Sequence, residues 1–330
     1  MAKRKIRVAI NGFGRIGRAA FKIMLDKKKY DVVAINDLAP AESLAYLLKY
    51  DTVYGAYGKK VLVKGHDIYV GGKKYHITAQ ADPKKLPWKK LKIDVVLECT
   101  GRFVKDGAAD AHIKAGAKKV IISAPAKGGG VDTFLLGVNQ AGYKNQKVIS
   151  NASCTTNCIA PVAQILVSKF GVDKAMMTTI HSYTADQALV DGPHKKDPRR
   201  GRSAAQNIVP TSTGAAIATA EVIPELRGLF DGLAVRVPTP IVSLSDFTFL
   251  LKKDVTVKQI NNVLITASKS KQYKGILGVT DEPVVSSDFI GDERSSIVDL
   301  SLTKVVGGNM VKIVAWYDND AFYTKQDSRT

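Results

Sequence analysis

A glycine-rich turn near the start of the chain constrains its fold more than any other feature. The turn reads Gly12-Phe13-Gly14-Arg15-Ile16-Gly17, and it follows an apolar, β-branched segment at residues 6–10. A helix-forming segment at residues 18–25 comes next, and a second β-branched segment at residues 32–35 leads to Asp37. This order of strand, turn, helix and strand predicts a parallel sheet covered by helices.

The same turn predicts a dinucleotide site. Gly12 permits the tight turn, Gly14 lets the backbone approach a pyrophosphate, and Gly17 lets the helix pack closely on the strand. The helix N-terminus offers N–H groups and a partial positive charge to the phosphates. Asp37 can accept hydrogen bonds from the ribose hydroxyls and would repel a 2′-phosphate, so NAD is favoured over NADP. The alternative is a structural turn that is merely rich in glycine.

Periodicity along the chain predicts two domains. Residues 1–150 continue with a hairpin-like passage and further strands and helices, at residues 60–63, 67–70, 75–77, 94–97, 107–115 (helix), 120–122 and 147–150. Residues 151–330 have longer strands and fewer helices, at residues 155–170 (helix), 175–182, 214–222 (helix), 233–237, 244–251, 256–269 (helix) and 311–316. We therefore predict an α/β protein: a Rossmann-type parallel-sheet NAD-binding domain at 1–150 and an α+β catalytic domain with a mixed or antiparallel sheet at 151–330.

Composition excludes several classes of protein. Hydrophobic residues make up 45% and charged residues 24% of the 330 residues, which excludes disorder, collagen and a coiled coil. The chain has no apolar stretch near the roughly 18 residues that a membrane span needs. Three cysteines, Cys99, Cys154 and Cys158, are too few for a disulfide scaffold and favour a reducing compartment, so we expect a cytoplasmic protein.

The positive charge is concentrated in the first half of the chain. Residues 1–150 hold 29 basic and 12 acidic residues, a net charge of +17, whereas residues 151–330 have a net charge of only +2. A solvated basic face is the favoured interpretation, because the lysine pairs lack interleaved aromatic residues on which bases could stack. The alternative is a side activity in binding RNA or another polyanion, which would weaken steeply with salt.

Cys154 and His181 are the candidate catalytic residues. Cys154 lies in the segment 150–158, where a strand gives way to a helix, and a helix start lowers a thiol pKa. Too few soft ligands lie nearby to predict a metal site. His181 ends a β-branched strand, which is a rigid platform for a general base. Either residue alone could instead be structural, and spacing does not show whether the two pair.

Several longer motifs occur in the order of one family. They include residues 11–17, 47–51, 150–158, 181–184, 210–216, 236–240 and 316–319. On these motifs the chain, from about residue 5 to about residue 319, closely resembles phosphorylating glyceraldehyde-3-phosphate dehydrogenase. The resemblance implies NAD-dependent oxidation and phosphorylation of D-glyceraldehyde 3-phosphate to 1,3-bisphosphoglycerate through a cysteine thioester.

The resemblance also implies roles for individual residues. Cys154 would be the nucleophile and His181 the general base. The site for the substrate phosphate would contain Thr184 and Arg236, and the site for inorganic phosphate would contain Ser153, Thr155, Thr213 and Gly214. Asn319 would orient the nicotinamide, and the rest of the cofactor site would include Thr100, Gly101, Ser123 and Tyr323. The long polar segment at residues 182–202 would contact a neighbouring subunit of a homotetramer.

The end of the chain departs from the family pattern. After Asn319, Phe322 stands where the family has a glycine beside Tyr323, and the seven residues after Tyr323 are mostly polar. We therefore expect the C-terminal helix of the family to be missing and NAD to be held less tightly than in a full-length relative. Two further alternatives remain: erythrose-4-phosphate dehydrogenase, which releases the acyl group to water, and a catalytically impaired relative.

Overall fold

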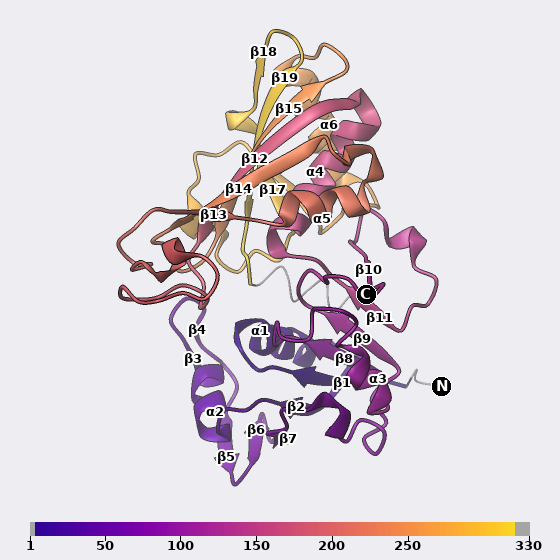
Figure 1. The fold of residues 1–330 in the computed structure, drawn as a ribbon, viewed down its shortest axis with the longest axis vertical. Helices are drawn as coiled ribbons and strands as arrows, with labels where there is room; N and C mark the ends of the chain where they lie inside the picture. Colours follow the sequence, from indigo (N-terminus) through magenta and orange to yellow (C-terminus); the bar gives the residue numbers. More distant parts are fainter. Residues whose placement is uncertain (1–3, 321–330) are drawn as a thin grey trace. The chain divides into compact units, whose positions relative to one another are not determined.

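The computed structural model describes residues 4–320, which form two compact units. Unit 1 contains residues 4–134 and 142–152, and unit 2 contains residues 135–141 and 153–320. Unit 1 is built on a mostly parallel sheet and unit 2 on a mixed sheet, which confirms the predicted fold class (Figure 1). None of the helices within residues 4–320 is long and apolar enough to cross a membrane.

The sheet of unit 1 has nine strands in the order β10-β11-β9-β8-β1-β2-β7-β6-β5. Their bounds are β1 (Ile6–Asn11), β2 (Tyr30–Asn36), β5 (Val61–Lys64), β6 (Asp67–Val70), β7 (Lys73–Thr78), β8 (Val95–Glu98), β9 (Lys119–Ile122), β10 (Asp132–Thr133) and β11 (Val148–Ser150). The strands from β10 to β7 pair in parallel, and the predicted hairpin strands β5 and β6 extend the sheet in antiparallel fashion. A separate ribbon joins β3 (Tyr50–Asp51) and β4 (Gly55–Ala56).

Three helices accompany this sheet: α1 (Arg15–Leu25), α2 (Ala41–Lys49) and α3 (Asp110–Lys114). Helix α1 buries Phe21 and Met24 in the core, as its apolar spacing predicts. Helix α3 is shorter than the predicted helix at 107–115. Its first turns are tighter, because the amides of Asp110 and Ala111 bond to carbonyls three residues earlier rather than four.

The sheet of unit 2 has the strand order β13-β14-β12-β15-β19-β17-β16, with β18 paired to β19. The bounds are β12 (Val172–Ser182), β13 (Val209–Ser212), β14 (Phe230–Val237), β15 (Ser243–Leu251), β16 (Leu277–Thr280), β17 (Ser296–Asp299), β18 (Lys304–Val306) and β19 (Met310–Tyr317). Strand β12 pairs in parallel with β14 and in antiparallel fashion with β15. The prediction of a mixed sheet is therefore confirmed.

Helices α4 (Cys154–Phe170), α5 (Ala215–Val222) and α6 (Val257–Lys269) pack against the sheet of unit 2 and one another (Figure 1). Helix α4 is apolar on most sides and largely buried, which is typical of a central helix. Short 3-10 turns occur at Pro83–Lys85, Gln140–Gly142, Pro198–Gly201, Pro224–Leu226, Ser286–Phe289 and Leu300–Leu302.

Candidate active site

Cys154 is the first residue of helix α4, as predicted. Ser153 caps the helix, and its hydroxyl accepts a hydrogen bond of 3.0 Å from the amide of Thr156. This cap fixes the start of the helix at Cys154, so the partly buried thiol lies where the backbone N–H groups have no partner within the helix. Just before the cap, Ala152 adopts the left-handed conformation with φ of 56°, a turn that no residue in the motif signals.

His181 lies opposite this thiol. Its Nε2 is 3.6 Å from Sγ of Cys154, and it comes from the end of β12 in the same unit. Nδ1 of His181 is 2.7 Å from the carbonyl oxygen of Ser182. Nδ1 also lies 2.9 Å from Nη1 of Arg236, which can only donate, whereas the Ser182 carbonyl can only accept, so the two contacts favour opposite tautomers. With the proton on Nδ1, as the carbonyl requires, Nε2 presents a lone pair to the thiol and can act as a general base.

Burial dominates the ionisation of this pair. It raises the pKa of the Cys154 thiol from 9.0 to about 11, and the nearby charge of Arg236 offsets only part of that rise. Burial, followed by the charge of Arg236, lowers the pKa of His181 from 6.5 to about 3. The predicted lowering of the thiol pKa is therefore wrong for the chain without ligands, because lost hydration outweighs the helix start. Thiol and imidazole are both neutral near pH 7.

Tyr317 contacts His181 and Thr155. It lies in the motif at residues 316–319 but was not predicted as a site residue. Its hydroxyl forms hydrogen bonds of 2.9 Å with the hydroxyls of both Thr155 and Thr179. Its ring meets the His181 ring edge to face, with 6.0 Å between centroids. The tyrosine is fully buried, and burial raises its pKa, so the neutral ring and hydroxyl orient the residues around Cys154. The hydroxyl of Thr155, an expected phosphate ligand, is engaged by this contact.

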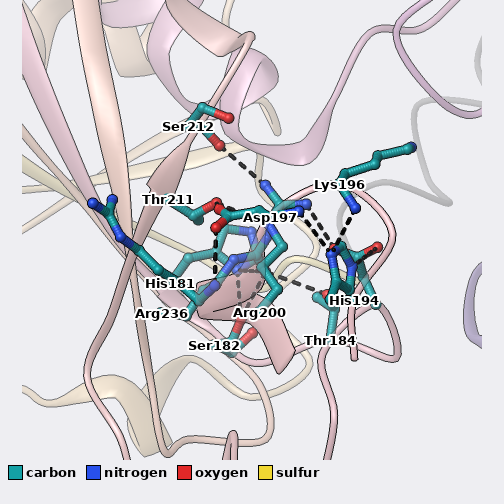
Figure 2. Close-up of polar contacts among 12 residues, drawn as sticks. His181, Ser182, Thr184, His194, Lys196, Asp197, Arg200, Thr211, Ser212 and Arg236 are labelled. Atoms are coloured by element: carbon teal, nitrogen blue, oxygen red, sulfur yellow. Dashed lines mark hydrogen bonds and ion pairs between the residues drawn. The ribbon is translucent and has the colours of Figure 1, made fainter. Parts of the chain in front are cut away.

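Arg236 lies beside His181 because their strands pair in register. Residues 181 and 236 are direct partners in the parallel pair β12 and β14. The Arg236 guanidinium donates to the Ser182 carbonyl at 3.0 Å and to the Thr184 hydroxyl at 3.5 Å (Figure 2). The two residues expected to bind the substrate phosphate are therefore neighbours, and Arg236 also lies 2.9 Å from Nδ1 of His181, the expected general base.

A second arginine, Arg200, comes from the long segment after β12. It donates to the Thr211 hydroxyl at 2.8 Å (Figure 2). It also pairs with Asp186 at 2.6 Å. Burial lowers the pKa of Arg236, and the like charge of Arg200 lowers it further. Arg200 was not predicted as a site residue, because its only signal in the sequence is the adjacent pair Arg199-Arg200.

Thr213 and Gly214 lie at the start of helix α5. Gly214 occupies the N-cap position, and the Thr213 hydroxyl accepts a hydrogen bond of 3.2 Å from the amide of Ala215. Helices α4 and α5 pack against each other, and Gly214 is exposed. The residues expected to bind inorganic phosphate thus come from the N-terminal ends of two adjacent helices, a setting that favours anions.

Asn319 follows β19 and is buried. Its Oδ1 accepts hydrogen bonds from the hydroxyls of Ser182, at 2.9 Å, and Ser243, at 3.3 Å. Ser182 follows His181 directly, so these bonds link Asn319 to the end of the strand that carries the general base. Tyr323, the other expected nicotinamide residue, lies outside the described residues, as does the segment expected to lack a helix.

The glycine-rich turn of unit 1 has the bare backbone that a pyrophosphate needs. Gly12 has φ of +92°, and a Cβ there would lie 2.8 Å from the Thr100 amide nitrogen. At Gly17 a Cβ would lie 2.0 Å from the Gly12 carbonyl oxygen, whereas Gly14 faces open space and precedes helix α1. The three glycines therefore fit the tight turn, the close packing and the open approach that were predicted.

The remaining expected cofactor residues lie in this turn or follow the ends of strands β2, β8 and β9. Asp37 accepts from the Phe13 amide at 2.7 Å and from the Ala39 amide at 2.9 Å, which fixes its carboxylate at the end of β2. The Phe13 side chain is fully buried, so only its backbone belongs to the turn. Arg15 is paired with Asp51 at 3.3 Å, and Ile16 lies in the first turn of α1. Thr100 and the exposed Gly101 follow β8, and Ser123 follows β9.

Metal ligands do not gather in the described part of the chain: no three His, Cys, Asp or Glu side chains within residues 4–320 are placed to hold an ion. The polar groups around Cys154 are hydroxyls, an imidazole and guanidinium groups. Such groups suit covalent catalysis on a substrate that carries phosphate.

Comparisons with known proteins agree with this chemistry. Two family models match: "Glyceraldehyde 3-phosphate dehydrogenase, NAD binding domain" over residues 6–106, and "Glyceraldehyde 3-phosphate dehydrogenase, C-terminal domain" over residues 153–319. Glyceraldehyde-3-phosphate dehydrogenase of Priestia megaterium is 51% identical over 323 residues, covering 97% of this chain and 96% of the relative. Glyceraldehyde-3-phosphate dehydrogenase 1 of Kluyveromyces lactis is 47% identical over 322 residues, covering 97% of each chain. The chain belongs to the glyceraldehyde-3-phosphate dehydrogenase family.

Proposed function

We propose that the chain oxidises and phosphorylates D-glyceraldehyde 3-phosphate to 1,3-bisphosphoglycerate, with NAD as cofactor, through a thioester on Cys154. The observation that carries the proposal is the contact of 3.6 Å between Sγ of Cys154 and Nε2 of His181, which accepts the thiol proton when Nδ1 donates to the Ser182 carbonyl. Arg236 and Thr184, beside this pair, offer donors for the phosphate of the substrate. The location of Cys154, His181 and Arg236 in one unit supports this assignment of a nucleophile, a base and an anion site.

The covalent step begins with both catalytic groups neutral. Sγ of Cys154 attacks the aldehyde carbon and forms a carbon–sulfur bond, while the thiol proton moves to Nε2 of His181. The imidazole returns that proton to the carbonyl oxygen, which gives a thiohemiacetal. The Nδ1–H bond to the Ser182 carbonyl keeps the ring oriented and stabilises the imidazolium while it exists.

Oxidation converts the thiohemiacetal into a thioester. NAD, when bound, accepts the hydride that leaves the substrate carbon. His181 takes the hydroxyl proton at the same time, so the carbonyl is formed again and the carbon–sulfur bond is kept. In our proposal the residues of this chain that hold NAD are the Gly12–Gly17 turn, Asp37, Thr100, Gly101, Ser123 and Asn319.

Inorganic phosphate then releases the acyl group. A phosphate oxygen attacks the thioester carbon, the carbon–sulfur bond breaks, and the sulfur recovers a proton from His181. We assign the attacking phosphate to Ser153, Thr213 and Gly214, at the starts of α4 and α5. Thr155 contributes by holding Tyr317, because its hydroxyl is already bonded there.

We propose a homotetramer as the working assembly. Unit 2 exposes apolar side chains on its sheet and on the segment after β12: Met176, Leu189, Val190, Ile208 and Leu233. Apolar surface of this kind is typical of protein–protein interfaces. Light scattering should give four times the chain mass of 35.6 kDa, and a monomer at micromolar concentration would contradict the assembly.

We also place the enzyme in the cytoplasm. Cys154 and Cys158 form no disulfide in the structure, and the proposed catalysis requires Cys154 to remain reduced. Cell fractionation tests this placement, and recovery of the protein outside the cytoplasm would contradict it.

The reaction is tested by following NADH formation with aldehyde, NAD and phosphate. Turnover with glyceraldehyde 3-phosphate should stop when phosphate is omitted, and the product should be an acyl phosphate. Sustained turnover without phosphate, with release of a free acid, would favour hydrolysis of the thioester instead. A higher kcat/KM for erythrose 4-phosphate than for glyceraldehyde 3-phosphate would reassign the substrate.

A further inference from the structure

Four polar side chains form a row across the sheet of unit 1. Glu98, Asn11, Asn36 and Thr78 end four adjacent strands, β8, β1, β2 and β7. The strand registers pair Asn11 with Glu98, Asn11 with Asn36, and Asn36 with Thr78. All four residues therefore lie at the same level, at the carboxyl ends of parallel strands, where ligands of such sheets bind.

Their side chains are hydrogen-bonded from strand to strand. The Thr78 hydroxyl donates to Asn36 Oδ1 at 2.8 Å, and Asn36 Nδ2 donates to Asn11 Oδ1 at 2.7 Å. Asn11 Nδ2 then donates to Glu98 Oε2 at 2.5 Å. We call this row, Thr78–Asn36–Asn11–Glu98, the polar ladder. Each bond points the same way, so the ladder ends on the carboxylate of Glu98.

Glu98 also accepts hydrogen bonds from two residues outside the ladder, His112 and Thr100. The indole N–H of Trp88 can only donate, and it lies 3.0 Å from Nδ1 of His112. His112 is therefore protonated on Nε2, which donates to Glu98 Oε2 at 2.9 Å. The amide of Thr100 donates to Oε1 at 2.8 Å, and the Thr100 hydroxyl bonds to the same oxygen.

Glu98 is thus a fully buried carboxylate surrounded only by donors. Glu98, His112 and Trp88 have no exposed surface, and Asn11 is 2% exposed. A carboxylate accepts through both oxygens and donates through neither, so it satisfies all these partners at once. An amide in its place would direct an N–H₂ group at one or two of the donors and leave them unpaired in the core.

Three of the four members of the ladder adjoin a segment of the proposed cofactor site. Asn11 precedes Gly12, and Asn36 precedes Asp37. Glu98 holds Thr100 directly, and its carbonyl oxygen accepts from both the amide and the hydroxyl of Ser123, each at 3.0 Å. The ladder therefore connects the glycine-rich turn, the acidic residue after β2 and the segments after β8 and β9.

We propose that Glu98 is a positioning residue for the dinucleotide, which acts through the polar ladder to hold these four segments at fixed separations. This inference rests on the proposed NAD site in unit 1. The ladder pre-organises the backbone around Gly12 and the carboxylate of Asp37, so that binding does not have to order them. All four residues of the ladder belong to unit 1, whereas Cys154 belongs to unit 2.

The test compares NAD dissociation constants by calorimetry in the full chain. Glu98→Gln should raise Kd at least about tenfold, since a buried donor loses its partner at each misdirected N–H. Thr78→Val, which removes only the first donor of the ladder, should raise Kd by a smaller factor of about two to five. The matched control is Ile68→Ala, which removes a buried side chain of β6 outside the ladder and should leave Kd within about twofold.

A double substitution separates the polarity of the ladder from its volume. Asn11→Asp alone places two carboxylates against each other and should weaken NAD binding strongly. Adding Glu98→Gln restores one carboxylate and one amide with their positions exchanged, so the double variant should bind NAD more tightly than Asn11→Asp. Equal Kd values for these two variants would overturn the inference, as would an unchanged Kd for folded Glu98→Gln.

A second readout does not depend on NAD. The rate at which iodoacetamide modifies Cys154 should be unchanged in Glu98→Gln, because the ladder acts only on unit 1. At saturating NAD the variant should keep kcat within about threefold while KM for NAD rises. An equal fall in kcat and alkylation rate would mean general misfolding and would also overturn the inference. Failure of the unmodified chain to bind NAD would instead contradict the proposed function.

Discussion

Arg236 acts on two neighbours at once. After burial, its charge is the next cause of the lowered pKa of His181, and it offsets part of the rise that burial causes in the pKa of Cys154; its guanidinium donates toward Thr184. Sequence indicated the residue only through its motif, because the register that places it beside His181 joins positions 55 residues apart. The strand register places Arg236, which we assign to the substrate phosphate, beside His181.

The guanidinium should matter most for substrates that carry phosphate. Arg236→Lys keeps the positive charge but loses the planar pair of donors, so kcat/KM for glyceraldehyde 3-phosphate should fall about tenfold or more. The loss for unphosphorylated glyceraldehyde should be much smaller. Arg227→Lys, at an exposed arginine, is the matched control. Equal losses on both substrates would contradict the assignment of Arg236 to the phosphate.

Alkylation of Cys154 in the ligand-free chain should increase with pH without a plateau below about pH 9. The thiolate is the reactive form, and burial raises the thiol pKa to about 11, so deprotonation is still incomplete there. Arg236→Met should slow alkylation further near neutrality, because it removes a charge that lowers this pKa. The measurement is the rate of iodoacetamide modification against pH, with the Arg227→Met variant as control. A plateau at neutral pH would mean that the helix start outweighs burial.

At the scale of elements, the start of α4 combines a stabilising cap with a proposed phosphate ligand. Ser153 bonds to the Thr156 amide, and Thr256 caps α6 in the same way through the Gln259 amide at 3.2 Å. The two caps are chemically alike, but Thr256 lies on a helix that carries none of the site residues. They therefore allow the structural and the catalytic effect of a cap to be measured separately.

Ser153→Ala and Thr256→Ala should each lower the free energy of unfolding by about 1 kcal/mol. Only Ser153→Ala should also raise KM for inorganic phosphate, because only Ser153 is assigned to its site. Urea unfolding and phosphate saturation curves measure the two effects. An equal change in KM for both variants would remove Ser153 from the phosphate site.

The glycine-rich turn gives a comparable contrast in unit 1. Gly17→Ala would place a methyl group 2.0 Å from the Gly12 carbonyl oxygen. The free energy of unfolding of this variant should therefore fall by about 3 kcal/mol. Gly14→Ala meets no atom within 4 Å, so it should fold normally but bind NAD at least about tenfold more weakly. Thermal unfolding and calorimetry test this pair, and normal NAD affinity in Gly14→Ala would contradict the assigned role of that glycine.

Local patterns predicted elements better than they predicted contacts. Three predicted features depend only on neighbouring residues and are confirmed: the strand at 6–10, the helix that ends at Leu25, and a helix start next to Cys154. Helix α2, strand β13 and strands β16 to β18 were not predicted, because short segments lack a clear period. The Tyr317–His181 contact and the bonds of Glu98 join distant positions, so no local signal could reveal them.

At the scale of the whole molecule, the proposed cofactor-binding and catalytic residues lie mainly in different units. Unit 1 carries the glycine-rich turn and the polar ladder, whereas unit 2 carries Cys154, His181 and the arginines. The charge of +17 on residues 1–150 remains consistent with either a solvated surface or weak polyanion binding, and electrophoretic mobility shifts at physiological salt distinguish the two. The family shows that the catalytic chemistry, rather than this charge, defines the protein.

The thioester on Cys154 is tested most directly by a single turnover without phosphate. The enzyme is mixed with glyceraldehyde 3-phosphate and excess NAD, NADH is followed, and the protein is quenched for mass spectrometry. We predict a burst of about one NADH per chain, an acyl group on the peptide that contains Cys154, and further turnover only after phosphate is added. Continued turnover without phosphate, or an undiminished burst in Cys154→Ser, would contradict it.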